Sequence, residues 1–314
     1  MINIERILCP ASLPHEFEEA LGFAVSLARA FGSRLFLCHY VDRPALVTVV
    51  ANKTATGQSR KFLEDSLTRH LERAAALEHY WKRIVVGYGD DAGEEIVREA
   101  GERRIDLIVM RSRRSRVAAL LGSTAEHVSR TAPCPVLIIR SKIQGLDGEQ
   151  NGDSRFKRVL VAHDFSSSSE LALSYAFSIS HKYRAELHLL HVLPVPQTDD
   201  PGTEWIESGD DSAFHRAISR MQDAVPGEVY RQCKVLNAVR WGKPYREVLT
   251  YSRQQNIDLV CMGALGRDFG SEALFGSNAD RVLRQASSHV LIARPLNAAM
   301  CAPLDPRRKP LFDV

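Results

Sequence analysis

Short apolar runs alternate with longer amphipathic stretches along the whole chain. In the second half, continuous apolar runs are typical of strands buried on both faces; they occur at 157–162, 186–192, 233–239, 257–262 and 289–293. The stretches between them have the apolar spacing of helices, at 167–183, 209–224, 243–255 and 277–287. This order predicts a parallel sheet built from βαβ units, in which each helix is a right-handed crossover that covers one face.

The first half of the chain repeats the second. Three pairs of segments match at one constant offset: RILCPAS (6–12) with RVLVAHD (158–164), LFLCHYV (35–41) with LHLLHVL (187–193), and RIDLIVM (104–110) with NIDLVCM (256–262). Residues 141–154 are rich in Gly, Asp and Ser without apolar periodicity, as in a linker. We therefore predict two tandem copies of one α/β domain, at 1–142 and 155–297, followed by a C-terminal tail at 298–314.

Composition narrows the class of protein. The 314 residues are 45% hydrophobic and 25% charged, which is ordinary for a globular protein, and the apolar runs are too short to cross a bilayer. The N-terminus lacks the apolar core of a signal peptide, so we expect a cytoplasmic protein that does not bind membranes. A net charge of +3 does not favour nucleic acid. The six cysteines have no C-x-x-C spacing and are expected to be reduced and structural.

The stretch MGALGRDFGSEALFGSNADRVL, residues 262–283, suggests a ligand site. Gly263 and Gly266 follow a predicted strand, and Gly276-Ser277 open the next predicted helix, so all lie at the carboxyl edge of the sheet. A helix N-terminus attracts phosphate, and glycine lets the backbone come close to it. Gly276-Ser277 alone would be explained as a helix cap; the two preceding glycines favour a phosphate loop.

This order of strand, G-x-x-G, spacer, Gly-Ser and helix resembles the ATP-binding motif of the universal stress protein family, in which tandem members are known. The resemblance covers both copies. It implies that each copy is a doubly wound, Rossmann-like α/β domain with a five-stranded parallel sheet flanked by helices.

The resemblance also implies an ATP site in the second copy, with any Mg²⁺ carried by the nucleotide. Asp164 would contact the adenosine part, Val192 would pack beside the base, and Met262 would lie near the ribose. The remaining residues would line the first strand end or hold the phosphates: Ala162, His163, Phe165, Gly263, Gly266, Arg267, Gly276, Ser277 and Asn278. Two alternatives stay open, namely Asp164 as a helix N-cap and Arg267 as a solvated surface charge.

The first copy departs from this motif. Its replacements are Ser12 for Asp164, Arg111 for Gly263 and Arg114 for Gly266. Long cationic side chains should block close approach of the backbone to phosphate, so we expect no ATP there in the family's manner. Conversely, we expect arginine at 263 and 266 to leave the second copy folded. The run RSRRSR at 111–116 could bind an anion or nucleic acid by charge, although a solvated loop is the favoured interpretation.

Local signals add three predictions. Capping boxes are predicted for Ser167 with Glu170, Ser277 with Asp280 and Ser123 with Glu126. His188 and His191 should point to opposite faces of their strand and so share no metal. The last strands, 135–139 and 289–293, should pair the two copies as an intramolecular pseudo-dimer; a homodimer of the whole chain is left open.

Three classes of function remain. The first is a nucleotide-responsive binding or regulatory protein of the stress response, acting through an unknown protein partner. The second is a weak ATPase or phosphotransfer enzyme, although no activating residue is evident and hydrolysis should be slow or absent. The third is an interaction module that binds no nucleotide.

Overall fold

The computed structural model describes residues 1–10, 17–42, 82–89, 91–112, 121–140, 155–194, 211–266 and 275–296. The chain forms two compact units. The N-terminal unit comprises Asn3–Arg155 with Pro295–Val314, and the C-terminal unit comprises Phe156–Arg294 with Met1–Ile2. The predicted linker and tail lie outside the described residues, so the exact domain boundaries stay a prediction.

The C-terminal unit contains five parallel strands in the order β10-β9-β6-β7-β8. Their bounds are β6 (Arg158–Ala162), β7 (Glu186–Leu193), β8 (Val235–Trp241), β9 (Leu259–Gly263) and β10 (His289–Ala293). The chain runs outward from β6 to β8, then returns to the other side of β6 with β9 and β10. The sheet is therefore doubly wound, and its order reverses between β6 and β9.

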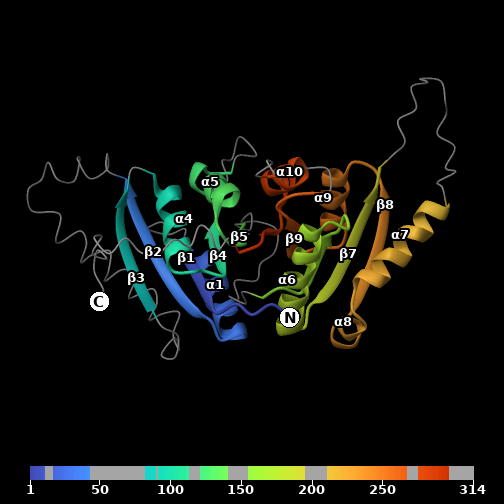
Figure 1. Cartoon of the computed structure of the whole chain (residues 1–314), viewed down its shortest axis with the longest axis horizontal. Helices are drawn as coiled ribbons and strands as arrows, with labels where there is room; N and C mark the ends of the chain where they lie inside the picture. Colours follow the sequence, from blue (N-terminus) through green and yellow to red (C-terminus); the bar gives the residue numbers. More distant parts are fainter. Residues whose placement is uncertain are drawn as a thin grey trace, which may run out of the picture. The chain divides into compact units, whose positions relative to one another are not determined.

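Helices connect these strands, with bounds α6 (Ser167–Tyr183), α7 (Asp211–Ala224), α8 (Gly227–Gln232), α9 (Pro244–Gln254) and α10 (Ser277–Gln285). Helix α6 packs on β6, β9 and β10, α7 packs on β7 and β8, and α9 contacts β7 and α10 (Figure 1). The five strands and four long helices confirm the sequence prediction to within a few residues. The short helix α8 was not predicted, because a helix of one or two turns carries no measurable periodicity.

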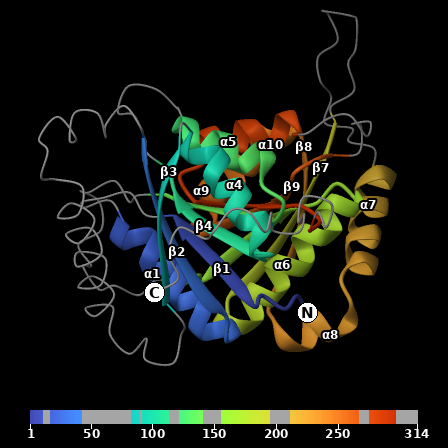
Figure 2. The ribbon, with the colours of Figure 1, turned by 60° about the vertical axis from the view of Figure 1, so that its left-hand side comes forward.

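The N-terminal unit repeats this arrangement with strand order β3-β2-β1-β4-β5. Figure 2 shows its strands β1 to β4 with helices α4 and α5. Its strands are β1 (Arg6–Pro10), β2 (Arg34–Asp42), β3 (Lys82–Gly89), β4 (Leu107–Arg111) and β5 (Val136–Ile139). Its helices are α1 (Phe17–Phe31), α4 (Ala92–Glu102) and α5 (Ser123–Thr131). Each unit thus has the five-stranded, Rossmann-like fold expected.

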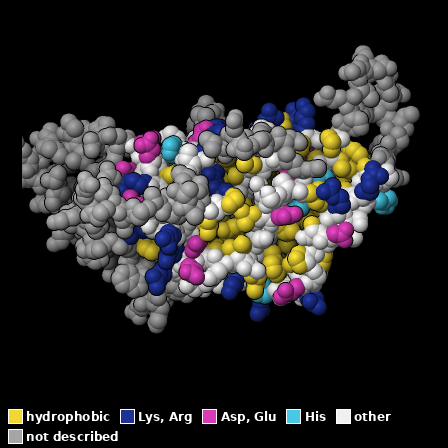
Figure 3. Space-filling view, viewed as in Figure 1, with side chains coloured by type: hydrophobic (Ala, Val, Ile, Leu, Met, Phe, Trp, Pro, Cys, Tyr) yellow, Lys and Arg dark blue, Asp and Glu magenta, His cyan; other side chains and the backbone are white. Residues whose placement is uncertain are grey.

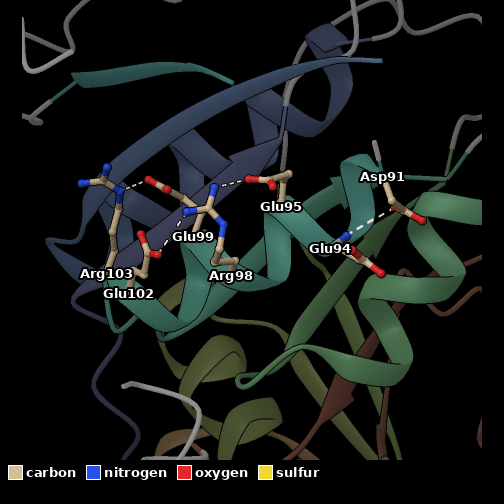
Figure 4. A network of polar contacts seen from close by, with 7 residues as sticks. All are labelled: Asp91, Glu94, Glu95, Arg98, Glu99, Glu102 and Arg103. Atoms are coloured by element: carbon tan, nitrogen blue, oxygen red, sulfur yellow. Dashed lines mark hydrogen bonds and ion pairs between the residues drawn. The ribbon is translucent and has the colours of Figure 1, made fainter. Parts of the chain in front are cut away.

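Charged side chains of helix α4 and its caps form a row of contacts along the helix (Figure 4). Asp91 caps the helix, accepting the backbone N–H of Gly93 at 2.6 Å, and Arg98 bridges to Glu95 and Glu102. Glu99 is only 4% exposed and pairs with Arg103. Because a buried carboxylate needs a partner, this pair stabilises the last turn of α4.

The strands form the centre of the interior of each unit. The central residues of β6, β9 and β10 are buried, because helices cover both faces of the sheet. Five cysteines are free and buried, in agreement with a structural role; Cys301 lies outside the described residues. Burial raises the pKa of the Cys9 thiol to about 12, so it stays protonated. No helix of the described part is long and apolar enough to span a bilayer.

One aspartate fastens the start of the first strand in each unit. Asp258 Oδ2 accepts the backbone N–H groups of Lys157 at 2.8 Å and Arg158 at 2.9 Å. In the N-terminal unit, Asp106 Oδ2 accepts those of Glu5 and Arg6 at 2.9 and 2.8 Å. The repeated I-D-L sequence is therefore a structural anchor of the fold.

Replacing Asp258 with Ala should destabilise the C-terminal unit by about 2 kcal/mol, because two charge-assisted hydrogen bonds are lost at the edge of the core. Chemical denaturation of the full chain measures this. Asp223→Ala, an exposed position on α7, is the control and should change stability by less than about 0.5 kcal/mol. Equal effects of the two substitutions would contradict the anchoring role.

Candidate functional site

Three segments of the C-terminal unit meet at the carboxyl edge of its sheet: the turn after β6, the loop after β9 and the start of α10. A Cβ atom at Gly263 would lie 2.6 Å from the Cβ of Ser168, so the end of β9 touches the first turn of α6. The backbone N–H of Gly276 donates to the carbonyl of Ala264 at 2.7 Å, which joins the loop to α10. The start of α6, the end of β9 and the start of α10 are therefore in contact at the switch point of the sheet.

Asp164 lies in the turn between β6 and α6. Its Oδ1 accepts both the backbone N–H of Ser166 at 3.0 Å and the Ser166 hydroxyl at 2.5 Å. The helix cap is Ser166, which forms a capping box with Ser169. The predicted box of Ser167 with Glu170 was thus wrong by one residue, and Asp164 is not the N-cap. Its carboxylate is instead oriented by the turn.

His163 precedes this turn and is 3% exposed. Its Nδ1 accepts the backbone N–H of Phe165 at 3.3 Å, so the proton of the neutral ring is assigned to Nε2, which is buried without a hydrogen-bond partner. Burial lowers the pKa of His163 to about 4, against a smaller opposing effect of Asp164. The ring is therefore neutral at pH 7.

The two histidines of β7 lie as predicted. His191 Nδ1 donates to the carbonyl of His163 at 2.7 Å, whereas His188 Nδ1 lies 2.9 Å from the hydroxyl of Tyr251 on α9. The two rings thus contact different elements. Within the described ranges, no group of three or more His, Cys, Asp or Glu could hold a metal ion.

Gly263 is required by packing, a role that the sequence did not reveal. The nearest atoms to a Cβ there would include the Ser168 carbonyl carbon at 2.7 Å and its oxygen at 2.9 Å, which are backbone atoms and cannot turn away. A side chain at this position must displace that backbone, so arginine there is expected to destabilise the unit, a cost that the sequence-based expectation of an undisturbed fold did not include.

Helix α10 begins without a side-chain cap. Gly276 is its N-cap and makes no side-chain capping bond, and Ser277 is the exposed first residue of the helix. The predicted capping box of Ser277 with Asp280 was wrong; Asp280 pairs with Arg284 at 3.0 Å instead. Helix α5 similarly begins after Gly122 without a side-chain cap, so the box of Ser123 with Glu126 was also wrong.

The other predicted residues lie around this edge. Ala162 ends β6, Val192 is half-buried on β7 beside Arg240 of β8, and Met262 is 7% exposed on β9. Asn278 is half-buried in the first turn of α10, and Gly266 is half-buried in the loop. Arg267 lies outside the described residues.

The equivalent edge of the N-terminal unit differs. Arg111 ends β4 where β9 has Gly263, and its Nε lies 3.6 Å from Glu19 Oε2 of α1. An ion pair with the first helix thus replaces the close backbone contact of the C-terminal unit. Ser12 and Arg114 lie outside the described residues.

Sequence reasoning missed one residue near the turn. The guanidinium carbon of Arg220, on α7, lies 3.9 Å from the centre of the Phe165 ring. No motif marks an arginine within an amphipathic helix as a neighbour of a turn so far away in the sequence.

The fold and this edge define a tandem pair of doubly wound α/β units, the second with a glycine N-cap at the start of α10. The sequence model of the Universal stress protein family matches residues 3–140 and 155–294. The chain therefore belongs to the universal stress protein family.

Similar proteins agree with this assignment. A universal stress protein of Mycobacterium tuberculosis (strain CDC 1551 / Oshkosh) is 29% identical over 178 residues, and one of Mycolicibacterium smegmatis is 31% identical over 177. Each match covers 56% of this chain and 56% of the relative, so the chain matches only about half the length of these relatives.

Solved structures support the fold over nearly the whole chain. A universal stress protein from Archaeoglobus fulgidus DSM 4304 has a TM-score of 0.64 at 20% identity, covering 92% of this chain and 98% of its own. A functionally unknown protein from Pseudomonas aeruginosa PAO1 has a TM-score of 0.66 at 18% identity, covering 95% and 94%.

Replacing Gly263 with Ala should destabilise the C-terminal unit by about 1–3 kcal/mol, because the added methyl group meets the backbone of Ser168. Gly227→Ala is the matched control, since a Cβ there has no neighbour within 4 Å; it should be neutral or stabilising by up to about 1 kcal/mol. Thermal and chemical denaturation measure both variants. A neutral Gly263→Ala would show that the contact is looser than described.

Acid should destabilise the protein partly through His163. The pKa of His163 is lowered in the folded chain, so between pH 7 and pH 4 the imidazole is protonated in the unfolded chain but not in the folded chain. Lowering the pH over this range should therefore reduce the free energy of unfolding by about 3 kcal/mol. In His163→Asn this contribution is absent, so the stability gap from wild type should narrow as the pH falls. The exposed His215→Asn controls for loss of an imidazole. A gap independent of pH would contradict the prediction.

Proposed function

We propose that the C-terminal unit binds ATP or a related adenine nucleotide across the ends of β6 and β9. The observation that carries the proposal is the contact of the Asp164 turn, the Gly263 loop and the uncapped start of α10 in one surface. The protein would act in the cytoplasm as a nucleotide-responsive binding or regulatory protein of the stress response, through a protein partner.

Each part of this surface suits one part of the nucleotide. The Asp164 carboxylate, held by Ser166, is an oriented acceptor for hydroxyl or amino groups of adenosine. Val192 and Met262 supply apolar surface beside the base and ribose. The backbone N–H groups at the start of α10, together with the helix dipole, suit the phosphates, with any Mg²⁺ carried by the nucleotide.

The same geometry favours binding over turnover. A general base needs a free lone pair near the attacking water. The neutral His163 ring offers none, because Nδ1 accepts the Phe165 N–H and Nε2 carries the proton. In the proposed binding mode the Asp164 carboxylate is occupied by Ser166 and by the adenosine part, so it does not serve water at the phosphates. We therefore propose that ATP is a ligand that stabilises one state of the protein.

The N-terminal unit, in the predicted domain 1–142, is proposed to bind no nucleotide in this manner. Arg111 occupies the position of Gly263, and its side chain is directed to Glu19. The proposal therefore predicts one nucleotide per chain.

Replacing Asp164 with Ser, the residue at position 12, should weaken ATP and adenosine alike by at least tenfold, or ~1.4 kcal/mol, because an oriented acceptor of the adenosine part is lost. Isothermal titration calorimetry of wild type and variant measures both affinities and the stoichiometry. The control is Asp223→Ser on the exposed side of α7, which should bind as the wild type does.

Two results would overturn the proposal in different ways. Failure of the wild type to bind any adenine nucleotide would favour an interaction module. Sustained phosphate release that disappears in Asp164→Ser would favour an ATPase or phosphotransfer enzyme on the same surface.

A further inference from the structure

Phe165 has a backbone conformation that bulky side chains rarely adopt. Its φ is 62°, in the left-handed region, where the Cβ crowds the following carbonyl. Such a residue persists only where its surroundings hold it, and strained residues cluster at functional sites. Contacts of the Phe165 side chain must therefore stabilise this conformation.

Three side chains contact its ring. The His163 ring lies edge-on at 5.0 Å between centroids, and the His191 ring is tilted at 4.6 Å. The Arg220 guanidinium carbon is 3.9 Å from the ring centre, well within the range of a cation–π contact. These residues come from the segment just after β6, from β7 and from α7. We call Phe165 and its three neighbours the Phe165 cluster.

The backbone around Phe165 sets the position of Asp164. The Phe165 N–H donates to His163 Nδ1, and the next N–H, that of Ser166, donates to Asp164 Oδ1. Rotation of Phe165 out of the left-handed region would redirect both N–H groups. The Asp164 carboxylate would then lose its orientation.

Arg220 is the member of the Phe165 cluster that comes from a helix. It is an exposed residue of α7, which packs on β7 and β8 (Figure 1), and basic and histidine side chains lie at the surface on that side of the unit (Figure 3). Among the described residues, its guanidinium has the Phe165 ring as its close contact and no carboxylate within ion-pair distance. Its charge is thus directed to the ring.

We propose that Arg220 is a positioning residue for the nucleotide site. It holds Phe165 in the left-handed conformation, and Phe165 in turn holds Asp164 ready for adenosine. The inference rests on the proposed function for its ligand. It also couples α7 to that site, because any movement of α7 that withdraws Arg220 releases the turn.

The test compares three variants of the full chain: Arg220→Ala, Arg220→Lys and the control Arg216→Ala. Arg216 lies one turn earlier on α7, is exposed, and donates to Ser212 Oγ at 2.7 Å. In calorimetry, Arg220→Ala should weaken ATP and adenosine equally, by about threefold to tenfold. Lysine should restore most of the affinity because it keeps a cation over the ring.

The comparison of ligands separates positioning from simple attraction. If Arg220 merely attracted phosphate, Arg220→Ala would weaken ATP and leave neutral adenosine unchanged, and the inference would be wrong. The same conclusion follows if Lys restores nothing or if Arg216→Ala weakens binding as much.

A second readout needs no nucleotide. In the ligand-free chain, amide hydrogen exchange at Ser166 should accelerate at least threefold in Arg220→Ala and stay unchanged in Arg216→Ala, because the turn opens more often. If the wild type binds no adenine nucleotide, the proposed function fails while this exchange result still decides whether Arg220 holds the turn. Unchanged exchange in Arg220→Ala overturns the inference.

Discussion

The site depends on the close approach of β9 to the first turn of α6. Gly263 leaves no room for a side chain against the backbone of Ser168, and this contact sets the glycine loop beside the Asp164 turn. The Gly276 N–H bond to Ala264 then carries the same constraint to the start of α10. One glycine thus has two consequences, since it closes the core at the switch point and keeps that edge free of side chains.

The two units share their scaffold and differ at this contact. Asp106 and Asp258 fasten the first strand of each unit with nearly identical hydrogen bonds, so the fold persists whether or not a ligand edge is present. At the edge itself, Arg111 and its ion pair with Glu19 stand where Gly263 meets α6. Replacement of the glycine at this edge therefore need not unfold a unit, provided that the first helix is rebuilt to accept the larger residue. This also explains why arginine cannot simply be transferred to position 263.

The sequence predicted those features that repeat with a period. Strands buried on both faces are continuous apolar runs, and because these runs recur in both halves of the chain, the fold could be predicted. The capping serines were misplaced because a cap is defined by backbone angles, and Ser166, Ser167 and Ser168 are indistinguishable by type. Contacts between distant elements left no signal at all: the packing role of Gly263 and the position of Arg220 over Phe165 follow only from the tertiary structure.

The arrangement around Phe165 suggests how the energy of this site is distributed. A left-handed phenylalanine costs of the order of 1–2 kcal/mol, and a burial-neutralised His163 without a partner for Nε2 adds a further cost. In the proposed role of Arg220, its cation and the aromatic contacts of the Phe165 ring offset the strain of Phe165 during folding. A ligand would then bind to an Asp164 carboxylate that is already oriented, so the loss of conformational entropy in the turn on binding would be small. The proposed Arg220 contact also makes the turn sensitive to α7, because the side chain that offsets the strain comes from a surface helix on a different segment of the chain. A site organised in this way is suited to linking occupancy at the sheet edge with the state of α7, and this requires no chemical step on the ligand.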